Sequence, residues 1–413
     1  MKYFDVTRLL SGALEANGQR GTATAFVILL LSSGLPASAQ SFFASNVTDP
    51  AAGVDRGSTS GIRKLDAPTA FLTFDTYGSE DIGPNILGLG YVQPDMAFSG
   101  DQLDVVGVIA GPSAEDSLEL RAGGIGYRFP ALGTRTEGIA YLSYANIALG
   151  TEANLAFDVS GTLSIGAVGI RHTAERENDA KLTSTAEVIA RRATGTAFGT
   201  QVIDEDLRLL RVSTLYQQGL PNLFQRRFAA AVTVGLDALG ASETSNGQAS
   251  TPGATSEYLR ASFSAETSIP LSEMWVANAG IIGQWSTDSL PVSQRCGYGT
   301  NSYARGFDQT YVLGDQCIGT RVEMAYNLQA PERTDTGFLF TQAYLGVDVG
   351  RLWNNANDVV PSRTDQWSSG SLGVRTIQGD FVGEAVLTHI FDKPTGVAPQ
   401  ERTRFWVRAG YRF

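Results

Sequence analysis

The sequence has few of the side chains that most often carry catalysis or bind metals: two cysteines, four methionines and two histidines among 413 residues. It contains no HExxH motif, no Cys/His metal cluster and no glycine-rich phosphate-binding loop. His172 and His389 fall at opposite ends of two different predicted strands, so they cannot share an acid–base site. The sequence therefore predicts no enzyme activity, no metal site and no cofactor.

Two further absences narrow the class of protein. The exported part of the chain has no run of about 18 consecutive apolar residues, which excludes a bundle of membrane-spanning helices. The net charge of −11 opposes binding to phosphates, so no nucleic-acid partner is expected. A chain of this length admits two or three domains or one large β-barrel.

What the sequence does have at its N-terminus is an export signal. Basic residues precede the apolar run "AFVILLL", which is followed by "PASAQ". This order predicts a signal peptide over residues 1–39 with cleavage after Ala39, although the long basic region leaves the translation start open. Residues 40–66 are polar and contain Gly, Ser and Pro, and they are expected to form either a flexible periplasmic tail or a segment inside a lumen.

From residue 67 onward the chain alternates apolar with small or polar side chains in stretches of strand length, which is the period of β-strands. In the last stretch, "TRFWVRAGYRF", Phe405 and Tyr411 share one face while Trp406 and Arg408 share the other. The same pattern predicts sixteen strands, near 67–76, 85–96, 102–112, 117–128, 136–147, 154–172, 181–195, 205–217, 227–238, 257–269, 274–286, 317–328, 337–350, 367–379, 381–392 and 403–413.

The connections between these strands indicate how they are arranged. With the first connection extracellular, the later outer connections are long, whereas two inner ones, 270–273 and 329–336, are short. This asymmetry, the even strand count and the export signal favour a closed outer-membrane β-barrel over residues 67–413 rather than a soluble sandwich. Charged side chains of both signs fall on the predicted inner face, namely Arg260, Glu266, Arg321, Glu323, Arg375, Glu384, Arg404, Arg408 and Arg412.

The two cysteines, Cys296 and Cys317, lie in the longest outer connection and at the start of the next strand. An exported protein meets oxidising conditions, so the pair is predicted to form a disulfide. About twenty residues lie between them, and closing such a loop stabilises the fold by roughly 3 kcal/mol in the chain-entropy model.

Four stretches together resemble one family. "FDTYGSEDIGP" is similar to its first-strand motif with Thr76 in place of Asn, and "GDQL" is similar to its second turn. "CGYGTNSYARGFDQTYVLGDQ" resembles its sixth extracellular loop with Ala304 in place of Val and Leu313 in place of Ser, and "YLGVDVGRLW" resembles the barrel-wall motif that follows. On these motifs the chain resembles the haemolysin secretion/activation (ShlB/FhaC/HecB-type) outer-membrane transporters of two-partner secretion, within the BamA-like superfamily.

The resemblance implies a sixteen-stranded barrel in a Gram-negative outer membrane, with its sixth loop folded into the lumen. It implies a loop-six motif made of Tyr303, Arg305, Gly306, Phe307 and Asp308. Arg305 is expected to contact the wall motif at Asp348 and Gly350, and Gly306 to give the loop tip the backbone freedom for a reversal. The terminal Phe413 resembles the signal that barrel-assembly machinery recognises.

The resemblance also sets the functional alternatives. Family members carry periplasmic POTRA modules that capture an unfolded client by strand addition, and residues 40–66 leave no room for one. Capture then falls to another polypeptide, or the barrel has lost secretion, or the gene is truncated. The three functional alternatives are a transporter, a porin-like passive channel and a structural surface protein. The favoured function is transport of a secreted β-helical adhesin or haemolysin by a lipid-embedded monomer, as loop six is displaced.

Overall fold

The structure is a computed structural model that describes residues 67–78, 83–112, 118–133, 135–150, 155, 158–176, 180–219, 225–242, 248–298, 303–307, 312–329, 332–334, 337–359, 361–394 and 401–413. The predicted signal peptide and residues 40–66 lie outside these ranges. Within them, no helix combines the length and apolar character needed to cross a bilayer.

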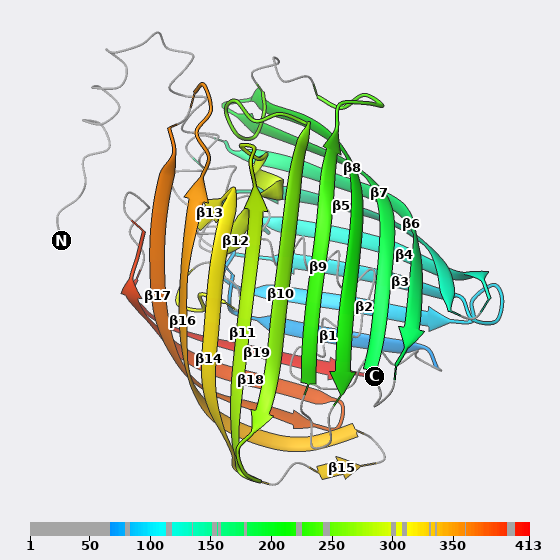
Figure 1. Ribbon diagram of the computed structural model, residues 1–413, viewed down its shortest axis with the longest axis vertical. Coiled ribbons are helices and arrows are strands. Elements are labelled where there is room, and N and C mark those ends of the chain that lie inside the picture. Colours follow the sequence, from blue (N-terminus) through cyan, green and yellow to red (C-terminus); the bar gives the residue numbers. More distant parts are fainter. Residues whose placement is uncertain are drawn as a thin grey trace.

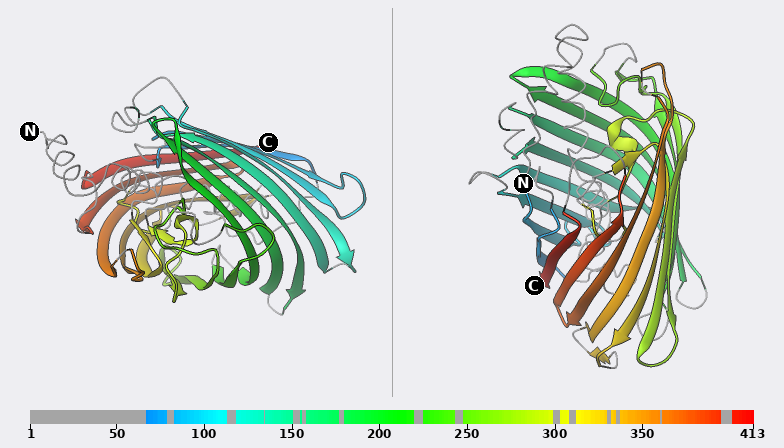
Figure 2. Two further views of the ribbon diagram at one scale, coloured as in Figure 1. Left: turned by 90° about the horizontal axis from the view of Figure 1, so that it is seen from above. Right: turned by 90° about the vertical axis from the view of Figure 1, so that its left-hand side faces the viewer.

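The described chain forms a closed antiparallel barrel of sixteen long strands, as predicted (Figure 1). Each strand pairs with its neighbours in sequence, and β1 pairs with β19, so no edge is left open. Figure 2 shows the curved wall from above and from the side. The strands are β1 (Thr69–Asp75), β2 (Ile86–Pro94), β3 (Gln102–Ala110), β4 (Leu120–Leu132), β5 (Thr136–Ala148), β6 (Ser160–Glu175), β7 (Ala180–Ala197), β8 (Thr200–Gly219), β9 (Gln225–Leu236), β10 (Tyr258–Pro270), β11 (Trp275–Ser286), β14 (Gln316–Asn327), β16 (Gly337–Asn354), β17 (Arg363–Gln378), β18 (Phe381–Asp392) and β19 (Thr403–Arg412).

Three short strands accompany the barrel. β15 (Glu332–Thr334) pairs with the start of β16 in a periplasmic connection. β12 (Cys296–Tyr298) and β13 (Val312–Gly314) form a separate two-stranded sheet in the connection between β11 and β14, residues 287–315, which we call loop six. The 3₁₀ turn η2 (Val292–Gln294) precedes β12.

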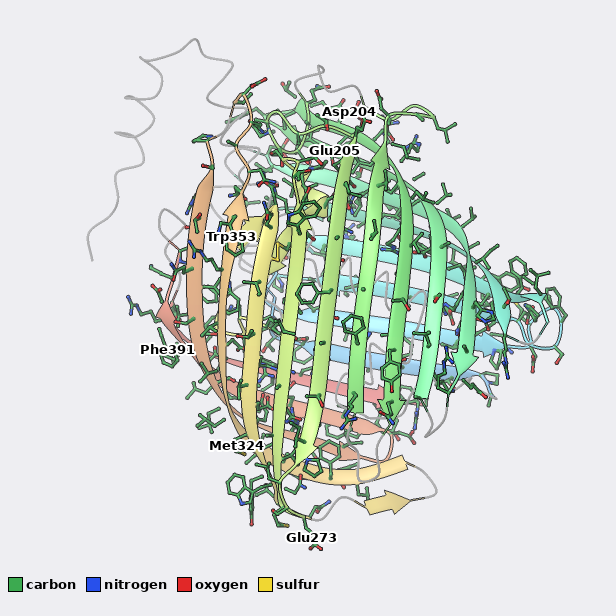
Figure 3. The ribbon with its side chains drawn as sticks, viewed as in Figure 1. Asp204, Glu205, Glu273, Met324, Trp353 and Phe391 are labelled. Carbon is green, nitrogen blue, oxygen red and sulfur yellow. A yellow bond between two sulfur atoms is a disulfide. The ribbon has the colours of Figure 1, made fainter. Side chains whose placement is uncertain are left out.

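The sixteen strands form because their side chains alternate between two environments. On β16, Leu345 and Val347 are 62% and 46% exposed on the outer face, whereas Tyr344 and Asp348 are 2% and 1% exposed. The outer residues suit lipid and the inner ones face the lumen, which confirms the parity predicted for this strand. Figure 3 shows the side chains projecting from both faces of the wall.

The β7–β8 connection is much shorter than predicted. The sequence predicts about nine residues between the strands near 181–195 and 205–217, but β7 and β8 meet in a turn at Phe198 and Gly199. Both turn residues have positive φ, 52° and 67°, which is the conformation of a tight hairpin turn. A phenylalanine in that conformation is uncommon, so the sequence carries no recognisable turn signal there.

The inner wall is not uniform. Its β2–β8 side carries buried apolar side chains, whereas its β14–β19 side carries most of the ion pairs described below. The buried apolar residues of β2–β8 that pack into one cluster are Val92, Val106, Val108, Ala110, Leu120, Tyr141, Ala145, Ile147, Leu163, Ala167, Ile189, Ala197, Leu207 and Leu209. The charged side chains predicted for the inner face therefore line only part of the wall.

The "GDQL" stretch builds a periplasmic turn between β2 and β3. The carboxylate of Asp101 accepts backbone N–H groups of Met96 at 2.7 Å, Ala97 at 2.9 Å and Phe98 at 3.2 Å, and the hydroxyl of Tyr127. Burial raises the pKa of Asp101, but the hydrogen bonds from Tyr127 and the backbone outweigh burial and leave the pKa below its ordinary value.

This turn gives a pH-dependent prediction. A carboxylate whose folded pKa is depressed stabilises the fold above its unfolded pKa, near 3.9, and loses that effect as pH falls through the folded pKa. We expect Asp101→Asn to lower the thermal unfolding midpoint at neutral pH, and the difference from wild type to shrink as the pH falls below about 4 and to vanish only below the depressed folded pKa. Thermal melts of the purified barrel across this range measure the effect, and a difference independent of pH would contradict it.

Candidate functional site: the seat of loop six

Loop six reverses direction at Tyr303–Phe307, which we call its tip. Ala304 has a positive φ of 56°, and the backbone N–H of Phe307 donates to the carbonyl of Ala304 at 3.0 Å, so the chain reverses here. From just beyond the end of β1, the hydroxyl of Tyr77 donates to the carbonyls of Phe307 at 2.8 Å and Ala304 at 3.4 Å. The reversal is thus held by the barrel and not only by the loop.

The Arg305 guanidinium is buried, with 2% of the residue exposed. Its Nη2 lies 3.0 Å from Oε2 of Glu323 on β14, its Nη1 donates to Oγ of Ser371 on β17 at 3.3 Å, and it lies 5.1 Å from the ring centroid of Tyr344. Burial lowers the pKa of Arg305, but the nearby Glu323 more than offsets this, so the pKa lies above its ordinary value and the guanidinium stays charged.

This geometry corrects the expected partner of Arg305. The ion pair is made to Glu323, and not to Asp348 as predicted. The backbone N–H of Arg305 faces the carboxylate of Asp348 without reaching the geometry of a full hydrogen bond. Asp348 instead stands opposite Arg321 in the β14–β16 register. The predicted partner is therefore near the tip but does not neutralise it directly.

Glu323 is the centre of an ion network that joins several strands. Its Oε1 accepts Arg375 of β17 at 2.8 Å and the side-chain amide of Asn278 at 3.0 Å. Arg375 lies 5.0 Å from the Tyr344 ring that Arg305 also approaches, so this ring contacts two guanidinium groups. The network pairs the buried Arg305 and the partly exposed Arg375 with one carboxylate and an aromatic ring.

The network continues beyond Tyr344 toward the barrel seam. The hydroxyl of Tyr344 donates to Glu384 on β18 at 2.8 Å, and the other oxygen of Glu384 lies 2.7 Å from Arg408 on β19. The sequence predicts that these charged residues lie on the inner face, but it does not predict which of them form ion pairs. The alternation of side chains identifies each inward residue separately, whereas its partner depends on the register between strands.

The apolar contacts between the tip of loop six and the barrel wall centre on Phe307. Phe307 is 1% exposed and packs edge-on against the Trp367 indole, with ring centroids 6.1 Å apart. Trp367 lies across from Gly350 on β16, where an added Cβ would come within 2.2 Å of the indole. Gly350, predicted as part of the wall motif, thus leaves the space in which Trp367 lies.

Gly306 has a different role from the one expected. Its φ is not positive, and the reversal uses Ala304 instead. A Cβ at Gly306 would lie 2.9 Å from Cγ1 of Ile390 and 3.0 Å from Cβ of Ser369. Gly306 therefore allows the tip to approach β17 and β18 closely, and a side chain there requires a small shift of Ile390 or Ser369.

The base of loop six is fixed by two features. Cys296 and Cys317 form the predicted disulfide, with Cα atoms 6.4 Å apart. Fully buried Asp315 accepts the backbone N–H groups of Leu290 at 2.9 Å and Asn355 at 2.8 Å, and lies 3.1 Å from Nε of Arg295. Loop six is therefore tied covalently to β14, and through Asn355 to the next extracellular connection.

The disulfide leads to a second prediction. Arg305 is itself a trypsin site that burial protects, so cleavage after it reports release of the tip. We expect Cys296→Ser with Cys317→Ser to speed this cleavage, because the base of the loop gains freedom while the tip contacts remain. Wild-type protein in reducing agent is the matched control, since these are its only two cysteines. An unchanged cleavage rate in both would contradict the anchoring role.

The remaining predicted residues are placed as follows. Asp308 lies outside the described residues. Phe413 is exposed, and its backbone N–H donates to Ala70 of β1 at 2.8 Å beside the seam. His172 contacts Thr136 and His389 contacts Thr403, on different strands. In the described ranges, no group of three or more His, Cys, Asp or Glu is arranged to hold a metal ion. Folding of the whole of loop six into the lumen stays a prediction.

Comparison with known proteins places this barrel in a family. A model of the haemolysin secretion/activation protein ShlB/FhaC/HecB matches residues 95–376, more than half of the chain. No curated protein matches it. Among solved structures, CdiB from Escherichia coli is similar over 86% of this chain and 64% of its own, at 18% sequence identity and a TM-score of 0.71.

Two further solved structures are similar at lower identity. CdiB from Acinetobacter baumannii is 16% identical over 85% of this chain and 61% of its own, with a TM-score of 0.64. BamA from Haemophilus ducreyi lacking POTRA domains 1–3 is 12% identical over 85% and 71%, with a TM-score of 0.57. The chain thus spans less than two thirds of the length of either CdiB chain. It is an outer-membrane β-barrel of the Gram-negative type and belongs to the haemolysin secretion/activation ShlB/FhaC/HecB family.

Proposed function

We propose that this protein is the outer-membrane translocator of a two-partner secretion pair, and that it passes an unfolded exported protein through its barrel as loop six is displaced. The observation that carries the proposal is the buried ion pair between Arg305 of loop six and Glu323 of the wall. A plug held by side chains at its tip and by a covalent bond at its base can leave its seat and return to it. The family to which the chain belongs supports the same function.

The contacts at the tip suit a reversible plug. A guanidinium about 4 Å from a carboxylate at an effective dielectric near 20 is attracted by roughly 4 kcal/mol, which the desolvation of both groups partly offsets. Hydrated charges on an arriving polypeptide can replace such a pair, whereas a wholly apolar seat has no comparable substitute. The client we propose is a secreted β-helical adhesin or haemolysin, handled by a monomeric barrel that is inserted by barrel-assembly machinery.

A secretion experiment tests the proposal. Cells with the gene deleted are compared with wild-type cells and with cells carrying the gene on a plasmid, and secreted proteins are identified by mass spectrometry. We expect one high-mass protein to vanish on deletion and to return with the plasmid. Unchanged secretion in all three strains would contradict the proposal.

A passive channel on the same barrel is the second candidate. The observation in its favour is a cavity of about 460 Å³, whose lining includes arginine, serine and threonine residues beside apolar ones. Steady open channels in planar bilayers, together with no secretion defect on deletion, would favour it over transport.

A further inference from the structure

Loop six has a second point of contact with the barrel, close to its start. Residues 288–295 contain the turn η2, and we call this segment the strap. Leu290 in the strap is fully buried and packs into the apolar cluster of β2–β8. The backbone carbonyl of Gln294 accepts hydrogen bonds from the guanidinium of Arg260 on β10 at 3.1 Å and from the side-chain amide of Gln284 on β11 at 2.9 Å. These wall residues differ from those that hold the tip.

The connection between β9 and β10, residues 237–257, is one partner of the strap, and we call it loop five. Oγ of Ser250 accepts the backbone N–H of Val292 at 3.0 Å and donates to Oε2 of Glu205 on β8 (Figure 3). The backbone N–H of Ser250 donates to the same carboxylate oxygen at 3.1 Å. Ser250 and Glu205 are both buried. One serine thus links the strap to loop five and to the wall.

The connection between β16 and β17 is a second partner of the strap. The side-chain amide of Asn357 donates to the carbonyl of Pro252 in loop five at 2.8 Å and to Oγ of Ser289 in the strap at 3.1 Å. The side-chain amide of Asn355 donates to the carbonyl of Asp288 at 2.8 Å. Three extracellular connections therefore meet at the strap and form one hydrogen-bonded rim.

The disulfide separates the strap from the tip along the chain. Cys296 directly follows the strap, and its bond to Cys317 ties it to β14, whereas the tip lies beyond this bond. A displacement of the tip therefore meets a covalent fixed point before it reaches the strap. The two parts of loop six have separate contacts with the barrel and an anchor between them.

We propose that loop six consists of two parts that move independently: a tip that leaves the wall, and a strap that stays in the rim with loop five when the tip leaves. The inference rests on the proposed transport function for its biological role, and it adds that a client passes beside a strap that keeps its place. The independence itself is measurable without secretion, in the purified full chain.

Trypsin cleavage tests this division, because each part of loop six carries one arginine. Arg295 ends the strap, where its Nε lies 3.1 Å from Asp315, and Arg305 lies in the tip. We expect Ser250→Ala to speed cleavage after Arg295 about tenfold, because the strap loses its hydrogen bond to loop five, and to leave cleavage after Arg305 unchanged. Mass spectrometry of the fragments assigns each cut, and heat-modifiable migration in gels confirms that each variant is folded.

The reverse variant is Glu323→Gln, which removes the partner of the tip. It is expected to speed cleavage after Arg305 and to leave cleavage after Arg295 within about twofold of wild type while the disulfide is intact. Faster cleavage at both sites in either variant would overturn the division, because it would show that the strap and the tip move together.

Two further variants make the test specific. Asn357→Ala removes the bond to Ser289 and should also speed cleavage after Arg295 alone. Ser242→Ala is the control in loop five: the Ser242 hydroxyl accepts a backbone N–H of β8 at 2.7 Å and, among the described residues, makes no hydrogen bond to the strap. Equal effects of Ser242→Ala and Ser250→Ala would overturn the link. If the two sites respond independently while gene deletion leaves secretion intact, the division of loop six stands and the transport function fails.

Discussion

Replacing Glu323 by Gln is expected to release the tip of loop six. The change keeps the shape of the side chain but removes the one carboxylate that pairs with both Arg305 and Arg375. Leaving a buried charge unpaired costs about 3–5 kcal/mol, so trypsin cleavage after Arg305 should speed by at least on the order of a hundredfold. If loop six is the plug that we propose, single-channel conductance should rise in parallel.

Asp348→Asn is the matched comparison. It also removes one buried carboxylate near Arg305, but one that makes no ion pair with the guanidinium. Its effect on cleavage is therefore expected to be clearly smaller than that of Glu323→Gln. Combining Arg305→Gln with Glu323→Gln and measuring conductance completes a double-mutant cycle, in which a coupling near zero would argue against the ion pair. A larger effect from Asp348→Asn would restore the partner expected from the sequence.

Gly350→Ala is the second change with a large expected effect. Its added Cβ would lie 2.2 Å from the Trp367 indole, which must move and withdraw its edge contact with Phe307. Overpacking of this kind costs about 1–3 kcal/mol, so we expect a lower thermal midpoint and faster cleavage after Arg305.

A glycine control and a rescue make this test specific. An added Cβ at Gly107 on β3 meets nothing within 4 Å, so Gly107→Ala should leave both measurements unchanged. Adding Trp367→Leu to Gly350→Ala should recover part of the thermal midpoint, since the smaller side chain makes room. The role of Gly350 as the space for Trp367 fails if both glycine variants behave alike.

The strands were predictable because alternation is a local property. Lipid requires apolar side chains on one face, and this requirement appears in the sequence of each strand without knowledge of its neighbours. The β7–β8 turn could not be predicted because Phe198 adopts a positive φ, which is uncommon for phenylalanine. The apolar patch on β2–β8 was missed because inward apolar residues are indistinguishable from outward ones when parity is read one strand at a time.

The residues of the candidate site were predictable from the sequence, but the ion pairs between them were not. Parity placed both Glu323 and Asp348 on the inner face, yet the nearer partner of Arg305 depends on where the loop tip comes to rest. That position is set by Tyr77 just after β1 and by Ser369 and Ile390 on the paired strands β17 and β18. No spacing in the sequence reports such contacts.

A designed cross-link tests the central claim, that the loop-six tip rests against the wall. In a Cys296→Ser, Cys317→Ser background, Gly306→Cys and Ser369→Cys would bring two thiols together, since a Cβ at position 306 lies 3.0 Å from that of Ser369. The control pair combines Gly306→Cys with Val347→Cys, because Val347 lies on the outer face of the barrel.

We predict that the 306–369 disulfide forms in the outer membrane of intact cells and that the control pair stays reduced. Mass spectrometry of the peptides detects the disulfide. Free thiols at both positions 306 and 369, open to a water-soluble maleimide, would contradict the account.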